Sequence, residues 1–299
     1  MSCTLHNNTP ILLYNPKKIY KCDSIFGHFA QLYLFYIQRH TIIGEKYIFM
    51  PQETRADDFF PGTGNSKWVA GQLAACLKDR AVDIARQSRR KYTFKKGDRV
   101  GFVFPVHTRA TPEIVIDFAR ALDLSKAFSY AVCTCADAAG HAMTELSRQV
   151  LLYSAYSVIM PNNNIIGAKG VDDNSTALHK MQLARERIAT IARGVAAKHL
   201  EFDVRVGGSA LRRAQELPAS ADPAALGTAA FHIRPEACSG CGACRKHCPV
   251  QAIALVAGTP TWIRPACQMC LRCINSCPGM AIEYGDLTQG RARYVFQPP

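Results

Sequence analysis

Cys238-Ser-Gly-Cys241-Gly-Ala-Cys244-Arg-Lys-His-Cys248-Pro249 is the stretch that decides the fold at the carboxyl end of this chain. It recurs as Cys267-Gln-Met-Cys270-Leu-Arg-Cys273-Ile-Asn-Ser-Cys277-Pro278. Each cysteine of the first run has its counterpart 29 residues later, from Cys238 and Cys267 to Cys248 and Cys277. A constant offset of this kind indicates an internal duplication. The two runs therefore predict a small domain with approximate two-fold symmetry, built around eight cysteines.

The cysteines could in principle serve three kinds of chemistry. A structural zinc ion takes four ligands, so one zinc site would leave half of the eight thiols without a role. Disulfides require an oxidising compartment. The chain has 13 cysteines, an odd number, without the spacing of a secreted disulfide-rich domain. These observations favour iron–sulfur chemistry in a reducing cytosol over zinc and over disulfides.

Both runs resemble the C-x2-C-x2-C-x3-C-P pattern of two-cluster bacterial ferredoxins. In that pattern three closely spaced thiolates bind one cluster and the fourth cysteine crosses to the other cluster. The resemblance implies two [4Fe-4S] clusters with crossed ligands. The first would be held by Cys238, Cys241, Cys244 and Cys277, and the second by Cys267, Cys270, Cys273 and Cys248.

The charge of the chain raises the question of nucleic acid as a partner. The formal net charge is +13, and much of the excess lies between Arg86 and Arg99. No groove-reading motif accompanies this segment, so we expect no nucleic-acid partner. A solvated basic face is the preferred interpretation, and docking of an acidic redox partner is the alternative.

The N-terminal segment indicates the compartment. Its longest apolar run, Leu32–Ile37, has six residues, which is far shorter than a membrane span, and no signal-peptide pattern precedes it. We therefore expect a cytoplasmic protein without a membrane span.

Strands and helices are predicted to alternate between residues 50 and 200. Three apolar runs, at 99–104, 128–133 and 156–160, are typical of strands buried in a parallel sheet. A helix is predicted after the first run, with Thr111 as its N-cap and Pro112 at its first position. Another follows the second run and extends to about Leu152, and a long amphipathic helix covers 178–199. This order predicts an α/β fold with a doubly wound parallel sheet.

The loops between these elements resemble those of the bacterial and archaeal flavodoxin–ferredoxin fusion proteins over roughly residues 57–285. The similarity lies in a glycine and hydroxyl loop that opens a helix, in the loops after the strands, and in the turn Met160-Pro161-Asn162-Asn163. It implies a flavodoxin-like domain that binds FMN. The phosphate would be held by Gly62, Thr63, Gly64, Asn65 and Ser66. The ring would be flanked by His107, Thr108, Arg109, Thr134, Cys135, Ala136 and Asp137.

The predicted organisation has five parts. They are an extension of unknown structure at 1–49, a flavodoxin-like domain at 50–200, a linker at 201–230, a two-cluster ferredoxin domain at 231–285 and a tail at 286–299. For residues 1–49 we also consider an upstream translation, with the reading frame beginning at Met50.

The predicted function is electron transfer through two [4Fe-4S] clusters coupled to FMN, with redox proteins as partners. Two alternatives remain open. One is a flavin-dependent reductase of a small molecule, and the other is an iron–sulfur redox sensor with an empty flavodoxin fold. The sequence shows no catalytic nucleophile and no acid–base pair.

Overall fold

The computed structural model describes residues 63–84, 92–107, 109–207, 227–263, 267–294 and 296. Every described residue belongs to one compact unit, Glu45–Pro299. The predicted extension at 1–49 and the site residues Gly62 and Thr108 lie outside the described residues.

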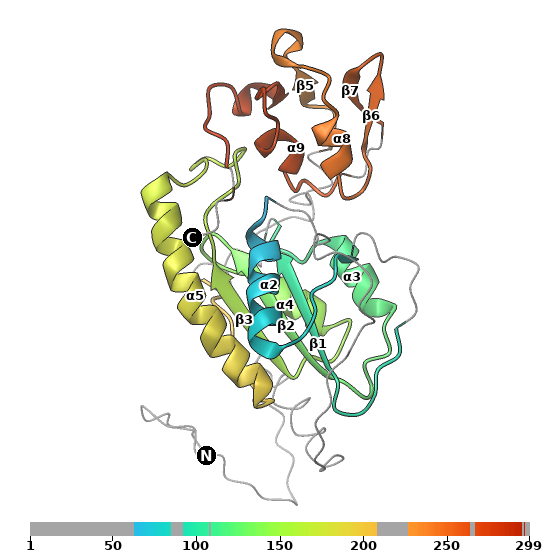
Figure 1. Ribbon diagram of the computed structural model, residues 1–299, viewed down its shortest axis with the longest axis vertical. Helices are drawn as coiled ribbons and strands as arrows, with labels where there is room; N and C mark the ends of the chain where they lie inside the picture. Colours follow the sequence, from blue (N-terminus) through green and yellow to red (C-terminus); the bar gives the residue numbers. More distant parts are fainter. Residues whose placement is uncertain are drawn as a thin grey trace, which may run out of the picture. The chain divides into compact units, whose positions relative to one another are not determined.

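A parallel sheet of four strands lies at the centre of the larger part of the described chain (Figure 1). Its strands are β1 (Arg99–Pro105), β2 (Phe128–Cys135), β3 (Ser154–Ile159) and β4 (Phe202–Asp203), and each lies beside the next in the sequence. Every residue of β2 is buried, as expected for a central strand of a parallel sheet whose two faces are both covered. The predicted mixed α/β fold with a parallel sheet is therefore confirmed.

Helices cover both faces of this sheet. On one face, α2 (Asn65–Leu77) and α5 (Asn174–Ala196) bury Leu73 and Ile188 against Tyr130 and Tyr156. On the other, α3 (Glu113–Arg120) and α4 (Ala142–Ser147) bury Val115 and Leu146 around Phe104. The two helix layers bury both faces of the sheet. The loops that connect each strand to the next helix gather at the carboxyl ends of the strands.

The start of α3 differs from the prediction. The helix begins at Glu113, with Pro112 at its N-cap, so the prediction of Thr111 as N-cap is wrong. The Thr111 hydroxyl donates instead to the carbonyl of Ala142 at 2.5 Å, and the Thr111 N–H donates to Glu145 Oε2 at 2.8 Å. The hydroxyl thus bonds to α4 instead of capping α3, and the local sequence does not show this contact.

Two further boundaries differ. The helix after β2 ends at Ser147, short of Leu152, whereas α5 begins four residues earlier than predicted, at Asn174. Asp173 caps α5 by accepting the N–H of Thr176 at 2.8 Å. Strand β4 lies in the stretch that the sequence assigns to the linker.

The C-terminal part is smaller and antiparallel. Strands β5 (Phe231–Ile233) and β8 (Ile282–Tyr284) form one pair, and β6 (Ile253–Val256) and β7 (Thr259–Trp262) form another. Short helices α8 (Ala243–His247) and α9 (Arg272–Asn275) lie between them, with 3-10 turns at Pro235–Ala237 and Gly285–Leu287. Its core includes Phe231, whose ring stacks on Trp262 with the centroids 4.9 Å apart.

No helix in the described ranges has both the length and the apolar character needed to cross a bilayer.

Candidate functional site

Two cavities in the C-terminal part are each lined by four cysteines. The first, the Cys238 cavity, is lined by Cys238, Cys241, Cys244 and Cys277. The second, the Cys267 cavity, is lined by Cys248, Cys267, Cys270 and Cys273. In each cavity three cysteines come from one run and the fourth comes from the other. Within the described ranges, no group of three or more His, Cys, Asp or Glu side chains converges closely enough to hold a single metal ion.

The duplicated sequence builds the same local structure twice. In the first run Gly242 adopts a left-handed conformation, φ 73°, at the N-cap of α8, which carries Cys244. In the second run Leu271 adopts it, φ 55°, at the N-cap of α9, which carries Cys273. Each short helix thus turns its cysteine toward a cavity directly after a left-handed residue.

Backbone N–H groups donate to several of the sulfurs. Ala252 donates to Cys248 Sγ at 3.2 Å, and Ala281 donates to Cys277 Sγ at 3.3 Å. These two bonds are equivalent under the duplication, and each involves a cysteine that crosses. Met269 donates to Cys267 Sγ at 3.4 Å. Donors of this kind stabilise thiolate charge, and around a bound cluster they help to set its reduction potential.

The thiols of the two cavities differ in environment. Burial raises the pKa of Cys267, raises that of Cys270 to about 12, and raises that of Cys273 well above its usual range. Cys241 is exposed, and hydrogen bonds from the Ala243 N–H and the Ser239 hydroxyl lower its pKa. Burial therefore disfavours the thiolate form of Cys267, Cys270 and Cys273, whereas the hydrogen bonds to Cys241 favour its thiolate form.

At the carboxyl ends of the sheet strands, the glycine loop is tied to its neighbours by side-chain hydrogen bonds. Ser66 Oγ and Thr134 Oγ1 lie 2.7 Å apart, and Asn65 Nδ2 donates to the carbonyl of Pro161 at 2.9 Å. Asn163 Nδ2 donates to the Thr63 hydroxyl. The structure thus brings three predicted loop residues together with Thr134, but it uses their polar side chains to fasten the loop to β2 and to the turn after β3.

Two residues outside this loop extend the network into the C-terminal part. Tyr294 donates its hydroxyl to Asn65 Oδ1 at 2.6 Å and its N–H to Asn275 Oδ1 at 2.9 Å. Asn275 Nδ2 in turn donates to the carbonyl of Asn163 at 3.2 Å. A chain of hydrogen bonds therefore runs from the glycine loop to α9, where Asn275 stands between Cys273 and Cys277.

Gly64 is covered by the end of the chain. Its φ of 117° is open to glycine, and a Cβ at this position would lie 2.7 Å from the Phe296 Cβ. The Phe296 ring also lies 6.4 Å from that of Trp68 on α2. The loop accordingly requires a glycine here, both for its backbone conformation and for the close approach of Phe296.

The remaining predicted ring-flanking residues have separate roles. His107 forms a hydrogen bond with the backbone of Gln268, beside Cys267, and burial lowers its pKa to about 4. Asp137 pairs with Arg205 at 3.5 Å on the surface. The Ala136 carbonyl accepts from Lys180 Nζ at 3.2 Å.

Arg109 and Cys135 also lie at this end of the sheet. Arg109 has a φ of 68°, and its carbonyl accepts from the His141 N–H at 2.8 Å. Cys135 is hydrogen-bonded to Cys133, which raises the pKa of Cys133 and lowers that of Cys135. Both thiols are buried, so neither is a surface thiol.

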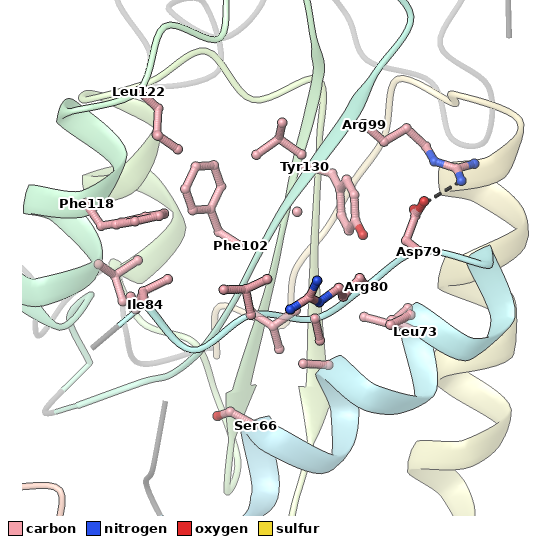
Figure 2. A pocket seen from close by; sticks show the side chains of 18 of the residues that line it. Ser66, Leu73, Asp79, Arg80, Ile84, Arg99, Phe102, Phe118, Leu122 and Tyr130 are labelled. Carbon is pink, nitrogen blue, oxygen red and sulfur yellow. Dashed lines mark ion pairs between the residues drawn. The ribbon is translucent and has the colours of Figure 1, made fainter. Parts of the chain in front are cut away.

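A third cavity, of about 190 Å³, lies between α2 and β1 (Figure 2). Its lining is mostly apolar, with Phe102 and Phe118 on one side, and the Arg99–Asp79 ion pair at 3.0 Å on the other. Of the predicted site residues that the structure describes, only Ser66 lines it. This cavity runs along the side of the sheet, and it reaches the residues at the strand ends only at Ser66.

The comparisons with known proteins identify one part of the chain. Residues 230–278 match the family model of a 4Fe-4S dicluster domain, which includes every cysteine of the two cavities. No curated protein and no solved structure matches the chain.

Proposed function

We propose that this protein, which contains a 4Fe-4S dicluster ferredoxin domain at residues 230–278, transfers electrons through two [4Fe-4S] clusters, one in the Cys238 cavity and one in the Cys267 cavity. The observation that carries the proposal is the division of eight cysteines between two cavities, three from one run and one from the other. Crossed ligation of this kind is typical of two-cluster ferredoxins, whose clusters each carry one electron at a time.

The protein's own contribution is the surroundings of the sulfurs. N–H donors from Ala252, Met269 and Ala281 stabilise negative charge on the thiolates. Buried apolar side chains limit the access of water to the cavities, with Ile253 in the lining of the Cys267 cavity and Ile282 in that of the Cys238 cavity. Hydrogen bonding and exclusion of water are two of the means by which proteins set cluster potentials.

FMN is the second cofactor in this proposal, at the carboxyl ends of β1, β2 and β3. Ligands of open parallel sheets bind at these ends, and the resemblance to flavodoxin–ferredoxin fusions supports the same place. Because the side chains of Asn65 and Ser66 already bond to protein atoms, the phosphate would be held by backbone N–H groups in the first turn of α2, whose N-cap residue, Gly64, has no side chain to cap them. Bound FMN would exchange electrons in pairs and singly.

Metal and sulfide analysis tests the clusters. Anaerobically reconstituted protein is expected to hold about eight irons and about eight sulfides per chain, as two cubanes require. A preparation that takes up zinc and shows no reducible chromophore under the same conditions would refute the proposal.

Two cysteine variants test the crossed arrangement. Cys248→Ser is expected to damage the cluster of the Cys267 cavity, and Cys277→Ser that of the Cys238 cavity, because each removes the one ligand supplied by the other run. Electron paramagnetic resonance of the reduced variants distinguishes the two clusters. Cys76→Ser, which removes an exposed thiol outside both cavities, is the control and should leave both signals unchanged. Loss of the opposite cluster in either variant would overturn the assignment.

Flavin titration tests the second cofactor. FMN is expected to bind apo-protein at least about tenfold more tightly than riboflavin, because a single charge-assisted hydrogen bond to the phosphate contributes about 1.5–3 kcal/mol. Quenching of flavin fluorescence measures both affinities. Equal affinity for the two flavins would show that no phosphate site exists at α2.

A further inference from the structure

The two cysteine cavities lie in different surroundings within the described chain. The Cys267 cavity adjoins the loops of the sheet: Gln268 bonds to His107, and Asn275, two residues after Cys273, bonds to Asn163. Ile165, which follows the turn after β3, is fully buried in the same core as Met269. This cavity therefore lies at the contact with the sheet.

The Cys238 cavity carries the exposed cysteine. Cys241 is exposed to solvent, and α8 follows it directly with two exposed cationic side chains, Arg245 and Lys246. Within the described ranges, neither of these residues forms an ion pair. Met280, close after Cys277, leaves 51% of its surface in solvent. Cys241 lines the cavity, Arg245 and Lys246 directly follow the lining residue Cys244, and Met280 stands between the lining residues Gly279 and Ala281.

We propose that this face, defined by Cys241, Arg245, Lys246 and Met280, is the docking surface for an acidic protein that carries a one-electron centre. The inference rests on the proposed function and adds to it the place and the charge of the partner. In the transfer, one electron leaves the reduced partner, which is oxidised, and the cluster-loaded protein gains it, with no proton or other group exchanged. The Cys267 cavity then faces the sheet and the Cys238 cavity faces the partner.

Charge complementarity is the reason for an acidic partner. Electron transfer falls steeply with distance, so a partner must approach the most exposed sulfur, and Arg245 and Lys246 stand beside Cys244 and Cys241 in the sequence. Two cations at the point of contact attract an acidic surface and repel a basic one. Redox partners use small, transient interfaces in which such charges govern the association rate more than the affinity.

The experiment uses the cluster-loaded full chain with an acidic plant-type [2Fe-2S] ferredoxin as the probe. Stopped-flow spectroscopy measures the second-order rate constant of electron exchange across a series of ionic strengths, and isothermal titration calorimetry measures binding at low salt. The rate constant is expected to fall as salt rises. The double variant Arg245→Glu/Lys246→Glu is expected to lower both the rate constant and the affinity by about tenfold or more.

A control pair separates local from general charge effects. Lys96 and Lys126 are exposed and precede strands β1 and β2, so Lys96→Glu/Lys126→Glu changes the net charge equally but at the amino ends of the sheet strands. This variant is expected to retain most of the rate. A basic probe such as cytochrome c should respond in the opposite direction, exchanging electrons faster with Arg245→Glu/Lys246→Glu than with the unaltered protein. A merely misfolded variant would not give this reversal.

Two outcomes would overturn the inference. One is a rate constant that does not depend on salt, and the other is an equal loss in the α8 variant and in the Lys96/Lys126 control. Reduction by a small viologen dye shows in each sample whether the clusters are present and reducible. Failure of cluster assembly, seen as absence of iron and sulfide, would refute the proposed function itself, whereas intact clusters with an unaffected partner refute only the docking surface.

Discussion

Tyr294 joins three segments that are far apart in the sequence. Its hydroxyl donates to the side chain of Asn65 in the glycine loop, and its N–H donates to the side chain of Asn275 on α9. Tyr294 and Asn65 are both buried, so water cannot replace the hydroxyl without some rearrangement. The Tyr294 hydroxyl therefore supplies the hydrogen bond that the buried Asn65 side chain accepts. The same bond ties the C-terminal segment to the sheet part.

We expect Tyr294→Phe to destabilise the folded protein by about 1–3 kcal/mol, because the variant leaves Asn65 Oδ1 buried without a donor. Urea unfolding followed by tryptophan fluorescence measures the change. Tyr130→Phe is the control, since the Tyr130 hydroxyl, as far as the described residues show, makes no hydrogen bond. Similar losses in the two variants would mean that the Asn65 contact contributes nothing of its own.

The sequence predicted the residues that share a repeated spacing, and it missed the residues whose role depends on individual contacts. Eight cysteines at repeated intervals predict their own division between two cavities, because the chemistry of the clusters fixes the pattern. Tyr294, Asn163 and Asn275 show no such pattern, since their bonds join segments separated by up to 229 residues. Thr63, Asn65 and Ser66 were predicted to hold a phosphate from the resemblance of their loop to flavodoxin-like loops, and that resemblance could not show that protein atoms already bind their side chains.

At the scale of the elements, two helices of the same layer each contain a glycine. Gly71 lies in the middle of α2, and a Cβ added there would meet nothing within 4 Å. Gly194 lies near the end of α5, and a Cβ there would come within 3.0 Å of the hydroxyl of the buried Tyr156. The helix propensity of alanine favours both substitutions equally. A difference in stability between the two variants therefore measures the effect of packing.

We expect Gly71→Ala to stabilise the protein by about 0.5–1 kcal/mol, because alanine loses less backbone entropy than glycine in a helix. Gly194→Ala is expected to be destabilising, since the contact with Tyr156 outweighs the same gain. Thermal unfolding of the two variants beside the parent protein measures both. A stabilised Gly194→Ala would show that the Tyr156 ring moves aside at no cost.

The strands were predictable where they form runs of apolar residues. The runs at 99–104 and 128–133 predicted β1 and β2, which pair in the structure. The two residues of β4 were not foreseen, because a strand this short has no periodicity of its own. It is identified only by its pairing with β3 and by the bond from Arg187 to the Asp203 carbonyl at 2.8 Å.

At the scale of the molecule, Arg291 connects the C-terminal part to the sheet part. Its guanidinium donates from Nη1 to the carbonyls of Ile165 at 2.9 Å and of Gly167 at 2.5 Å. Both carbonyls belong to the segment between β3 and α5. Arg293, two residues later, instead pairs with Glu283 at 2.8 Å inside the C-terminal part. The two arginines thus offer a matched comparison between a contact across the two parts and a contact within one.

We expect Arg291→Gln to separate the unfolding of the two parts, which should unfold together in the parent protein. The chain has two tryptophans, Trp68 on α2 and Trp262 on β7, so replacing each in turn by Phe leaves one reporter in each part. Thermal unfolding followed by the remaining fluorophore should then give two midpoints in Arg291→Gln. Arg293→Gln, the control, is expected to weaken the C-terminal part without this separation, and coincident midpoints in Arg291→Gln would contradict the role given to that residue.

The crossing of Cys248 and Cys277 between the two cavities bears on the ancestry of the domain. Before the duplication, a peptide with one run of cysteines had three of them for its own site and a fourth that pointed away from it. Such a peptide could complete a four-cysteine site only together with a second copy, to which it supplied its fourth cysteine and from which it took one. The ancestor of this domain is therefore expected to have been a two-fold symmetric dimer of identical chains. Fusion of the two copies into one chain then made this exchange of cysteines independent of the protein concentration.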